Sequence, residues 1–579
     1  MDQNLEHKRH TLAHLLAASV RELYPGAKNA IGPAIDDGFY QDFELPKPIP
    51  EAELLKIESL MRKKLATWDK FEKREVTASE AKDEFAWNEY KTELINEFAT
   101  EGKTLTFYTV GGFVDLCKGG HVDNPAKDIA LDSFKLDRIA GAYWRGDEKK
   151  PMLTRIYGLA FDTKVELDAF LAQREKMRER DHRKIGKELK LWVFSDLVGA
   201  GLPLYTPKGT ALQMALREYL MEINMRYGAQ PVTIPHMAKR ELYEISGHAA
   251  KFGDELLAVH SHYGEFVLKP VNCPHHIQIY ASEPRSYREL PIRYVEITAQ
   301  HRDEKPGEIG GLARTRSFSV DDGHIFCRLE QVEEEAKNIA NIVKDFYTSF
   351  GMWGNHWVSW SVRDPEHPEK YIGEPTDWDK AEAMLKKVSD EMNLDAKRME
   401  GEAALYGPKL DFMFTDALGR ERQLATIQID FSMPKRFGLE YIDSDGSKKT
   451  PIIIHRAICG SLERFMMILI EHFAGAFPFW LSPVQVKVLP VSEKHVEYAR
   501  SVLKALKDAG LRAEIDDANE SLGKKIRNAK TQKIPYLFVL GDKEVEANTV
   551  TVENRTASEG AMPLDTIIDR LKIEYHDRV

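Results

Sequence analysis

Residues 296–327 constrain the fold of this chain more than any other stretch. They read EITAQHRDEKPGEIGGLARTRSFSVDDGHIFC, in which two apolar runs flank a turn rich in glycine and proline. Two such runs joined by a glycine-containing loop predict an antiparallel hairpin. Arginines stand near the ends of both runs, at Arg302, Arg314 and Arg316, and guanidinium forks there suit a polyphosphate ligand. The local pattern fits a surface hairpin with solvated charges equally well.

Composition bounds the class of protein. The 579 residues are enough for about four domains, and 43% hydrophobic with 30% charged residues is typical of globular proteins. Charged residues follow Met1 directly, so no signal peptide is expected. The most apolar long stretch, residues 465–481, contains Glu471 and His472 and is too short and polar to cross a membrane. Four cysteines in so long a chain indicate a reducing cytoplasm rather than a disulfide framework.

The net charge of −11 argues against general affinity for nucleic acid. A nucleic-acid ligand would need local basic surfaces. The sequence holds two, residues 174–190 and the cluster Lys524, Lys525, Arg527, Lys530 and Lys533. Each of them also fits a solvated helix face.

Histidine and cysteine recur at the same spacing in the N-terminal part. Residues 9–23 have helical periodicity, which places His10 and His14 on one face. Cys117 and His121 are also four residues apart and follow a β-like run at residues 105–116. Thiol and imidazole groups are the usual donors of zinc sites. The four residues therefore have the composition of a metal-ligand set, and two unrelated local pairs are the alternative.

The segments HRDE, GGLARTRSF and DDGHIFC within residues 296–327 resemble the second signature motif of class II aminoacyl-tRNA synthetases, and among these the threonyl-tRNA synthetases. Residues 204–235, expected to form a long helix and then a strand ending at Pro235, resemble the first motif, a dimer-interface element. Residues 452–472, expected to form a strand, a glycine turn and an amphipathic helix, resemble the third. The resemblance implies an ATP site. Arg302 would contact the α-phosphate and Arg464 the γ-phosphate as the catalytic pair, with further contacts from Glu304, Arg314, Phe318 and Gln423.

The resemblance also implies a zinc ion. The motifs NCPHH, DDGHIF and IHRAI match the family at Cys273, His324 and His455. Three protein ligands leave zinc a position for substrate, and in the family the amino and hydroxyl groups of threonine bind there. The matching threonine contacts are Asp322, Tyr406 and Gln428. The sequence departs from the family in the pocket wall, where Val320 replaces a glutamine of some members and Leu424–Ala425 replaces a frequent Cys-Gly.

This choice of metal predicts a second, hydrolytic site. A site that must use a hydroxyl rejects valine by roughly 10⁴-fold or more, whereas serine lacks only a methyl group and is rejected by roughly 10–200-fold. Residues 30–40 and 134–158 resemble the editing domain shared by threonyl- and alanyl-tRNA synthetases. The resemblance implies a pocket that hydrolyses seryl-tRNA, lined by His10, His14, Asp115, Cys117 and His121. Alanyl enzymes hold zinc with this set, and the threonyl family is not thought to need it.

The expected architecture is α+β and multidomain. It has an α+β editing domain at residues 1–163, a helical linker at 164–192, a class II catalytic domain with an antiparallel sheet at 193–482, and an α/β anticodon-binding domain at 483–579. In the last domain the resemblance assigns anticodon contacts to Glu546 and Arg555. The ubiquitin-like domain that usually precedes the editing domain in bacterial members is expected to be absent.

The resemblance implies a cytoplasmic homodimeric threonine–tRNA ligase that uses ATP with Mg²⁺, L-threonine and tRNA(Thr). An inactive paralogue that binds RNA is a second hypothesis, and it predicts loss of a zinc ligand or a phosphate arginine. A synthetase for proline or serine is a third, although those families lack this combination of motifs.

Overall fold

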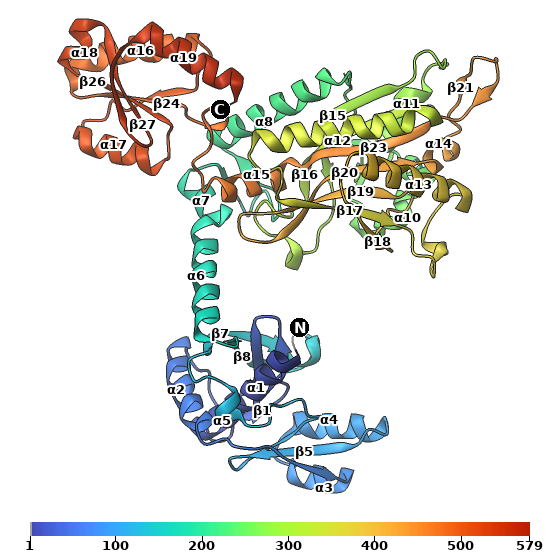
Figure 1. The fold of residues 1–579 in the computed structure, drawn as a ribbon, viewed down its shortest axis with the longest axis vertical. Helices are drawn as coiled ribbons and strands as arrows, with labels where there is room; N and C mark the ends of the chain where they lie inside the picture. The colour runs from blue at the N-terminus through green and yellow to red at the C-terminus, as the bar shows by residue number, and fades with distance from the viewer. Residues whose placement is uncertain (1–2, 579) are drawn as a thin grey trace. The chain divides into compact units, whose positions relative to one another are not determined.

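The computed structural model describes residues 3–578, and the chain divides into two compact units, Met1–Lys176 and Met177–Val579 (Figure 1). Each unit has its own hydrophobic core. No helix in the described part of the chain is both long enough and apolar enough to cross a membrane.

The first unit is α+β, as expected. Its main sheet has the strand order β1-β3-β8-β7, with β1 at Lys28–Asn29, β3 at Gly38–Glu44, β7 at Phe134–Tyr143 and β8 at Met152–Ala160. Helices α1 (Gln3–Leu23) and α2 (Leu54–Leu65) share a core with this sheet. A smaller sheet contains β4 (Glu72–Val76), β5 (Leu105–Val110) and β6 (Phe113–Leu116).

The single β-run predicted at residues 105–116 is wrong in detail. It is a hairpin of β5 and β6 that turns at Gly111 and Gly112, whose φ angles are +51° and +79°. Residues with side chains rarely adopt this left-handed conformation, so the two glycines reverse the chain. The reversal brings Asp115 and Cys117 back beside β5.

The predicted helical connector contains two helices, α6 (Lys164–Arg180) and α7 (His182–Glu188). The boundary between the two compact units falls within α6. Helix α7 belongs to the core of the second unit, because Ile185 and the following Leu189 and Trp192 are buried in it.

The second unit is built on an eight-stranded sheet with the order β11-β15-β16-β23-β20-β19-β17-β18. The six inner strands, from β15 to β17 in this order, pair antiparallel, and only the two outermost pairs are parallel. In this order, the bounds of the eight strands are Gln230–Pro231, Ile292–His301, Ser317–Cys327, Ile452–Ser461, Glu421–Asp430, Lys409–Thr415, His356–Val362 and Lys397–Glu400. The antiparallel catalytic core is thereby confirmed, including the hairpin of β15 and β16.

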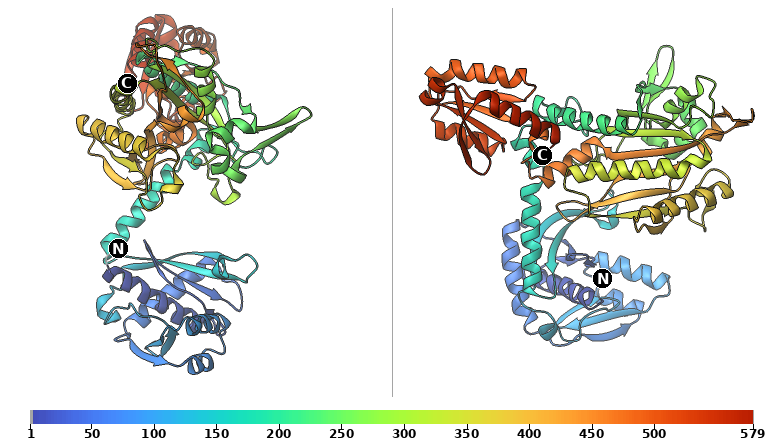
Figure 2. Two further views of the ribbon diagram at one scale, coloured as in Figure 1. Left: turned by 90° about the vertical axis from the view of Figure 1, so that its right-hand side faces the viewer. Right: turned by 45° about the horizontal axis from the view of Figure 1, so that its top comes forward.

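Three helices pack with this sheet, α8 (Pro207–Arg226), α12 (Val332–Ser349) and α15 (Leu462–His472) (Figure 1 and Figure 2). Helix α12 has a strongly apolar face that buries Ile339, Val343 and Phe346. The strand predicted to end at Pro235 is shorter than expected, since β11 covers only Gln230–Pro231.

The C-terminal sheet has the order β25-β24-β26-β27-β28. Strands β24 (Val486–Pro490), β25 (Ala513–Ile515) and β26 (Tyr536–Leu540) are parallel and alternate with helices α16 (Val496–Asp508) and α17 (Leu522–Thr531). Strands β27 (Thr549–Asn554) and β28 (Ser558–Pro563) pair antiparallel. The parallel α/β prediction therefore holds for three strands, and the final hairpin makes the sheet mixed.

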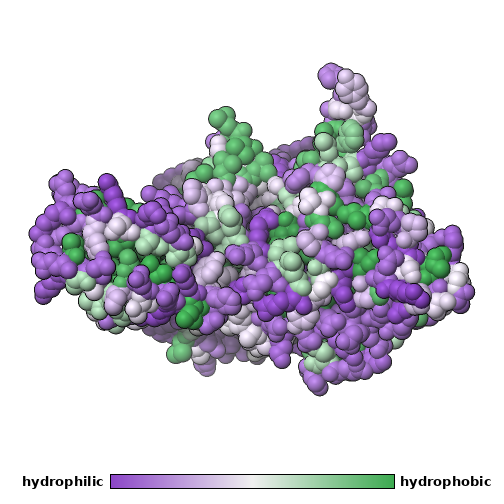
Figure 3. Space-filling view, turned by 90° about the horizontal axis from the view of Figure 1, so that it is seen from above, coloured by the Kyte–Doolittle hydropathy of each residue, from purple (hydrophilic) through white to green (hydrophobic). Residues whose placement is uncertain are grey.

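Hydrophobic side chains gather in several patches among hydrophilic ones on the face drawn in Figure 3. One group of exposed hydrophobic residues is close together in the sequence. Between residues 193 and 204 five large hydrophobic residues are exposed: Val193, Phe194, Leu197, Val198 and Leu204.

Candidate active site and candidate hydrolytic site

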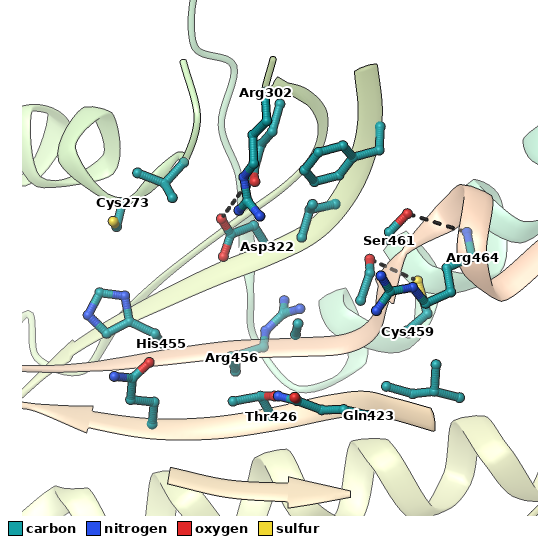
Figure 4. A pocket seen from close by; sticks show the side chains of 18 of the residues that line it. Cys273, Arg302, Asp322, Gln423, Thr426, His455, Arg456, Cys459, Ser461 and Arg464 are labelled. Carbon is teal, nitrogen blue, oxygen red and sulfur yellow. Dashed lines mark hydrogen bonds between the residues drawn. The ribbon is translucent and has the colours of Figure 1, made fainter. Parts of the chain in front are cut away.

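A cavity of about 490 Å³ lies over strands β15, β16, β20 and β23 of the second unit. It is lined by all twelve residues for which the sequence predicted ATP, threonine or zinc contacts: Cys273, Arg302, Glu304, Arg314, Phe318, Asp322, His324, Tyr406, Gln423, Gln428, His455 and Arg464. Figure 4 shows Cys273 and His455 at one end, Arg464 at the other, and Arg302 and Asp322 between them.

Strand periodicity explains much of this convergence. Alternate residues of a strand face the same side of a sheet, so Phe318, Asp322 and His324 of β16 reach one cavity. His324 lies directly opposite His455 on β23, and His455 lies opposite Gln428 on β20. The pairing between β16 and β23 shifts in register between Val320 and Asp322.

Cys273, His324 and His455 are buried, and one donor atom from each lies within 4.8 Å of the others. Cys273 is the first residue of α11 (Cys273–Ala281), and the two histidines stand on neighbouring strands. Burial lowers the pKa of His324 well below its usual value, so its imidazole is neutral. Burial raises the pKa of the Cys273 thiol. A neutral imidazole is ready to ligate a metal, while the thiol must first lose its proton. One sulfur and two nitrogen donors fit Zn²⁺.

Each of the two histidines uses one ring nitrogen for a protein contact. His455 Nε2 lies 2.8 Å from Asp430 Oδ2, and His324 Nδ1 lies 2.8 Å from Nδ1 of His276. Metal-binding histidines characteristically engage their second nitrogen in this way. Neither Asp430 nor His276 was predicted from the sequence, although His276 stands inside the motif NCPHH and Asp430 stands two residues after the predicted Gln428.

The opposite end of the cavity is rich in arginine. Arg314 Nε donates to Glu304 Oε2 at 2.6 Å, and Arg464 Nε donates to the carbonyl of Ala313 at 3.2 Å. Burial lowers the pKa of Arg302 and of Arg464. Ser461 caps α15 by accepting from the amide of Arg464, which fixes the start of that helix at the cavity wall. Within the described residues Arg314 is paired with Glu304 and Glu308, whereas Arg302 and Arg464 form no ion pair. Two partly desolvated guanidinium groups without a carboxylate partner favour a polyanionic ligand.

Asp322 lies between the two ends. Its Oδ2 accepts from Asn272 Nδ2 at 3.0 Å, and Gln300 Nε2 lies 3.5 Å away. Burial raises the pKa of this carboxyl. Gln423 is held by a bond from its Nε2 to Asp411 Oδ1 at 2.7 Å. The sequence did not predict the role of Asp411.

Arg456 and Asp321 form a buried ion pair, with 2.8 Å between Nη1 and Oδ1. Asp321 also accepts from the amide of Ile458 at 2.8 Å. Because Arg456 adjoins His455 and Asp321 adjoins Asp322, the pair ties β23 to β16 where both carry cavity residues. Arg456 also lines the cavity, but the sequence held no signal for its pairing with Asp321, because the two residues are far apart in the chain.

The first unit contains a second cluster. His10 Nε2 lies 3.2 Å from His14 Nε2 and 3.5 Å from Cys117 Sγ, which lies 3.3 Å from His121 Nε2. These four donor atoms lie within 4.8 Å of one another. Asp115 Oδ2 lies 3.4 Å from His14 Nδ1, so all five residues predicted for the editing pocket come together.

The cluster is electrically neutral apart from its carboxylate. Burial lowers the pKa of His10 to about 4 and of His121 to about 3, and it raises the pKa of Cys117 to about 11. Lys91, which was not predicted, pairs with Asp115 at 2.7 Å, and Asn29 donates to the other carboxylate oxygen at 3.0 Å. Imidazoles with such low pKa values are weak bases, so they are better suited to orienting a water molecule than to removing its proton.

The two residues predicted to contact the anticodon have different surroundings. Glu546 is exposed on α18 (Asp542–Ala547). Arg555 donates to backbone carbonyls, among them those of Lys533 and Phe477 at 2.9 and 2.7 Å. These contacts account for its guanidinium without RNA, and anticodon recognition by either residue stays a prediction.

The predicted basic surface on α17 is smaller than expected. Lys525 is buried and donates to the carbonyl of Pro490 at 3.0 Å. Lys524, Arg527 and Lys530 are exposed.

Comparison with known proteins agrees with this architecture. Residues 257–473 match the family model described as the tRNA synthetase class II core domain (G, H, P, S and T). Residues 485–574 match an anticodon binding domain, and residues 105–157 match the threonyl and alanyl tRNA synthetase second additional domain.

Relatives align over nearly the whole chain. Threonine–tRNA ligase of Gloeobacter violaceus is 46% identical, over 98% of this chain and 92% of its own length. The Rubrobacter xylanophilus enzyme of the same name is 46% identical, over 94% and 85%. A solved RNA binding domain of threonyl-tRNA synthetase from Cryptosporidium parvum superimposes with a TM-score of 0.65 at 35% identity, over 68% of this chain and 98% of that one. The chain therefore belongs to the threonine–tRNA ligase family of class II aminoacyl-tRNA synthetases.

Proposed function

We propose that this protein uses ATP to join L-threonine to tRNA(Thr), and that a second site hydrolyses seryl-tRNA(Thr). One observation carries the first activity. A single cavity presents arginines at one end and a thiol–imidazole donor set at the other. An amino acid held by the donor set would direct its carboxylate toward the phosphates of a nucleotide held by the arginines.

The ATP half of the reaction follows from charge. A carboxylate oxygen of threonine attacks the α-phosphorus, and pyrophosphate leaves. Arg302 and Arg464 stabilise the charge that develops on the phosphate oxygens, and the Mg²⁺ that accompanies ATP adds positive charge. Arg314 holds the phosphates, while Glu304, Phe318 and Gln423 are assigned to the adenine end and the ribose side of the pocket. The ribose hydroxyl of tRNA then attacks the mixed anhydride and displaces AMP.

The threonine half depends on Cys273, His324 and His455, which would hold Zn²⁺. Bound there, the metal supplies a Lewis acid for the amino and hydroxyl groups of the substrate. Asp322 would accept a hydrogen bond from the hydroxyl, because its carboxylate lines the cavity 3.8 Å from Nε2 of His324. Tyr406 and Gln428 form the remaining wall. A pocket that requires the hydroxyl discriminates strongly against valine and weakly against serine.

Because serine is rejected only weakly, some seryl-tRNA forms, and a second site is needed to hydrolyse it. In the first unit, His10, His14, Cys117 and His121 surround a small space with neutral donors, and Asp115 lies beside His14. We assign these residues to holding the ester of seryl-tRNA and orienting a water molecule against it. Positioning can supply much of the rate here, because an aminoacyl ester is already reactive.

We also propose the domain limits, a homodimeric state, a cytoplasmic location and two anticodon contacts. The domain limits are 1–163, 164–192, 193–482 and 483–579, in the order editing, linker, catalysis and anticodon binding. The exposed hydrophobic residues between 193 and 204 favour a homodimer, since such patches mark association surfaces. Four free cysteines favour a reducing cytoplasm. Glu546 and Arg555 are assigned to the anticodon.

Exchange of pyrophosphate into ATP, measured with each of the twenty amino acids, tests the ligase assignment. We expect exchange with threonine, exchange with serine lower by roughly 10–200-fold, and exchange with valine lower by roughly 10⁴-fold or more. An RNA-binding paralogue without activity would show no exchange. A synthetase for proline or serine would show its highest rate with that amino acid.

A further inference from the structure

The two histidines of the proposed zinc site, His324 and His455, are held by different kinds of contact. On His455, a carboxylate contacts the ring directly, with Asp430 Oδ2 2.8 Å from Nε2. On His324, the contact comes from another imidazole, with His276 Nδ1 2.8 Å from Nδ1. The rings of His276 and His324 are nearly perpendicular, at 89°, with centroids 4.7 Å apart. His276 is fully buried on α11, one turn after Cys273.

The hydrogen-bond pattern fixes where the protons must be. A metal on His324 needs the lone pair of Nε2, so the ring hydrogen of His324 must be on Nδ1. Nδ1 then donates to His276, and Nδ1 of His276 must be the acceptor. A neutral His276 therefore carries its hydrogen on Nε2.

A carboxylate oxygen of Glu296 lies near this hydrogen, at a distance longer than a hydrogen bond. Glu296 Oε2 lies 3.9 Å from His276 Nε2, and within the described residues neither atom has a hydrogen-bond partner. Both side chains are at least nine-tenths buried. Glu296 Oε1 accepts from the amide of Ile234 at 3.2 Å, which anchors the carboxylate in this orientation. The negative charge of Glu296 near Nε2 thus favours the tautomer of His276 that carries its hydrogen on Nε2.

We propose that His276 and Glu296 are positioning residues for the zinc site, and that they hold His324 in the tautomer and ring orientation that present Nε2 to the metal. The inference rests on the proposed zinc site and adds residues beyond its three ligands. The carboxylate acts through one imidazole on the ligand, whereas Asp430 acts on His455 without an intermediate. Partners of this kind typically contribute 10–100-fold to metal affinity.

Zinc affinity of the full-length protein, measured by competition with a chromophoric chelator, tests the proposal. The informative variant is His276→Leu, which keeps the volume and removes the acceptor. His276→Asn can place an oxygen near the position of Nδ1 and should restore part of the affinity. His275→Leu is the matched control, because His275 is buried on the same helix and its ring nitrogens have no partner within the described residues.

We expect His276→Leu to bind zinc about 10–100-fold more weakly, Glu296→Gln to weaken binding to a smaller extent, and His275→Leu to bind as the parent does. The cobalt-substituted protein supplies a second readout. The visible ligand-field band should shift in His276→Leu and not in His275→Leu, because only the former removes the contact that orients the ligand His324.

A folded His276→Leu variant with unchanged zinc affinity and an unshifted cobalt band would overturn the proposal. If His276→Leu does not fold, as judged by circular dichroism, Glu296→Gln decides, and unchanged affinity in that variant has the same consequence. Cys273→Ser separates this inference from the zinc site itself. Loss of zinc in Cys273→Ser with retention in His276→Leu rejects only the positioning role, whereas retention in both rejects the zinc site.

Discussion

The guanidinium carbon of Arg302 lies 5.2 Å from the ring centroid of Phe318, and the ring of Phe252 lies 4.9 Å from the same carbon. Two aromatic rings therefore hold this arginine, and no carboxylate within residues 3–578 forms an ion pair with it. Its Nε is buried and has no hydrogen-bond partner within the same residues. Aromatic contacts orient a guanidinium without neutralising it, so the donors of Arg302 remain available for a phosphate.

Arg302→Ala should lower the rate of adenylate formation by about 10²–10³-fold, the usual cost of removing one donor to a developing charge. The affinity for threonine should change far less, because the charge partner of Arg302 is the reacting phosphate. Pyrophosphate exchange and equilibrium threonine binding measure the two quantities. Arg302→Lys is the matched control, since it keeps the charge and loses the fork. Equal losses in exchange and in threonine binding would indicate a structural arginine.

Cys273→Ser should lose the metal and the activation of threonine while the fold persists, because the thiolate would be one of the three proposed protein ligands. Metal content and pyrophosphate exchange are the measurements. Cys327→Ser changes another buried cysteine, on β16 outside the cavity lining, and should retain the zinc. Full exchange activity in Cys273→Ser would disprove the zinc assignment.

The double change His10→Ala with His14→Ala should leave threonylation near normal and let seryl-tRNA accumulate. Both rings belong to the cluster of the first unit, which shares no cavity-lining residue with the adenylate site. Deacylation of preformed seryl-tRNA by the folded variant is the deciding measurement. If the histidines only pack the domain, the variant will melt at a lower temperature and still clear added seryl-tRNA.

The histidines of this cluster, His10, His14 and His121, should make stability depend on pH, because burial lowers the pKa of each. Their folded-state pKa values are about 4 for His10 and about 3 for His121, lowered by burial first and by neighbouring charges, including Lys118 for His10. In the unfolded chain a histidine titrates near 6.5. As the pH falls from about 6.5 toward 4, the unfolded state binds protons that the folded state does not, and each such histidine costs about 1.4 kcal/mol of stability per pH unit.

Melting temperature at pH 7.5 and at pH 5 measures this effect. The parent protein should lose stability at pH 5, and the variant His10→Ala with His14→Ala should lose less. An equal decrease in both proteins would assign the pH dependence to other groups.

Anticodon recognition can be separated from stability. Glu546→Ala should raise the KM for tRNA and leave pyrophosphate exchange unchanged, because Glu546 is exposed on α18. Arg555→Ala should also lower the free energy of unfolding, by about 0.5–1.5 kcal/mol, because the carbonyls of Lys533 and Phe477 lose a charged donor. Kinetics with saturating threonine and ATP give the KM, and denaturant titration gives the stability. A normal KM in both variants would remove these residues from the anticodon site.

The sequence by itself nominated the residues of the proposed adenylate and zinc sites, because they stand in short motifs that resemble those of the synthetase family. Phe318, Asp322 and His324 stand on one strand of the predicted hairpin, and strand alternation directs such residues to one side of a sheet. Periodicity predicted the hairpin and the histidine pair of α1, and the family resemblance predicted the antiparallel core. These features are local, and local patterns survive in any fold that forms the strand or helix.

Only the tertiary structure decided which groups support those residues. The contacts of His276 with His324, of Asp430 with His455 and of Lys91 with Asp115 join residues far apart in sequence. They depend on strand register and on chain reversals such as the one at Gly111 and Gly112. The structure also buried Lys525 and set the exposed Arg555 against backbone carbonyls, and no sequence pattern marks either contact. The physical reason is common to all of them: a buried polar group must find a partner in three dimensions, and the partner is set by the packing of distant elements rather than by neighbouring residues.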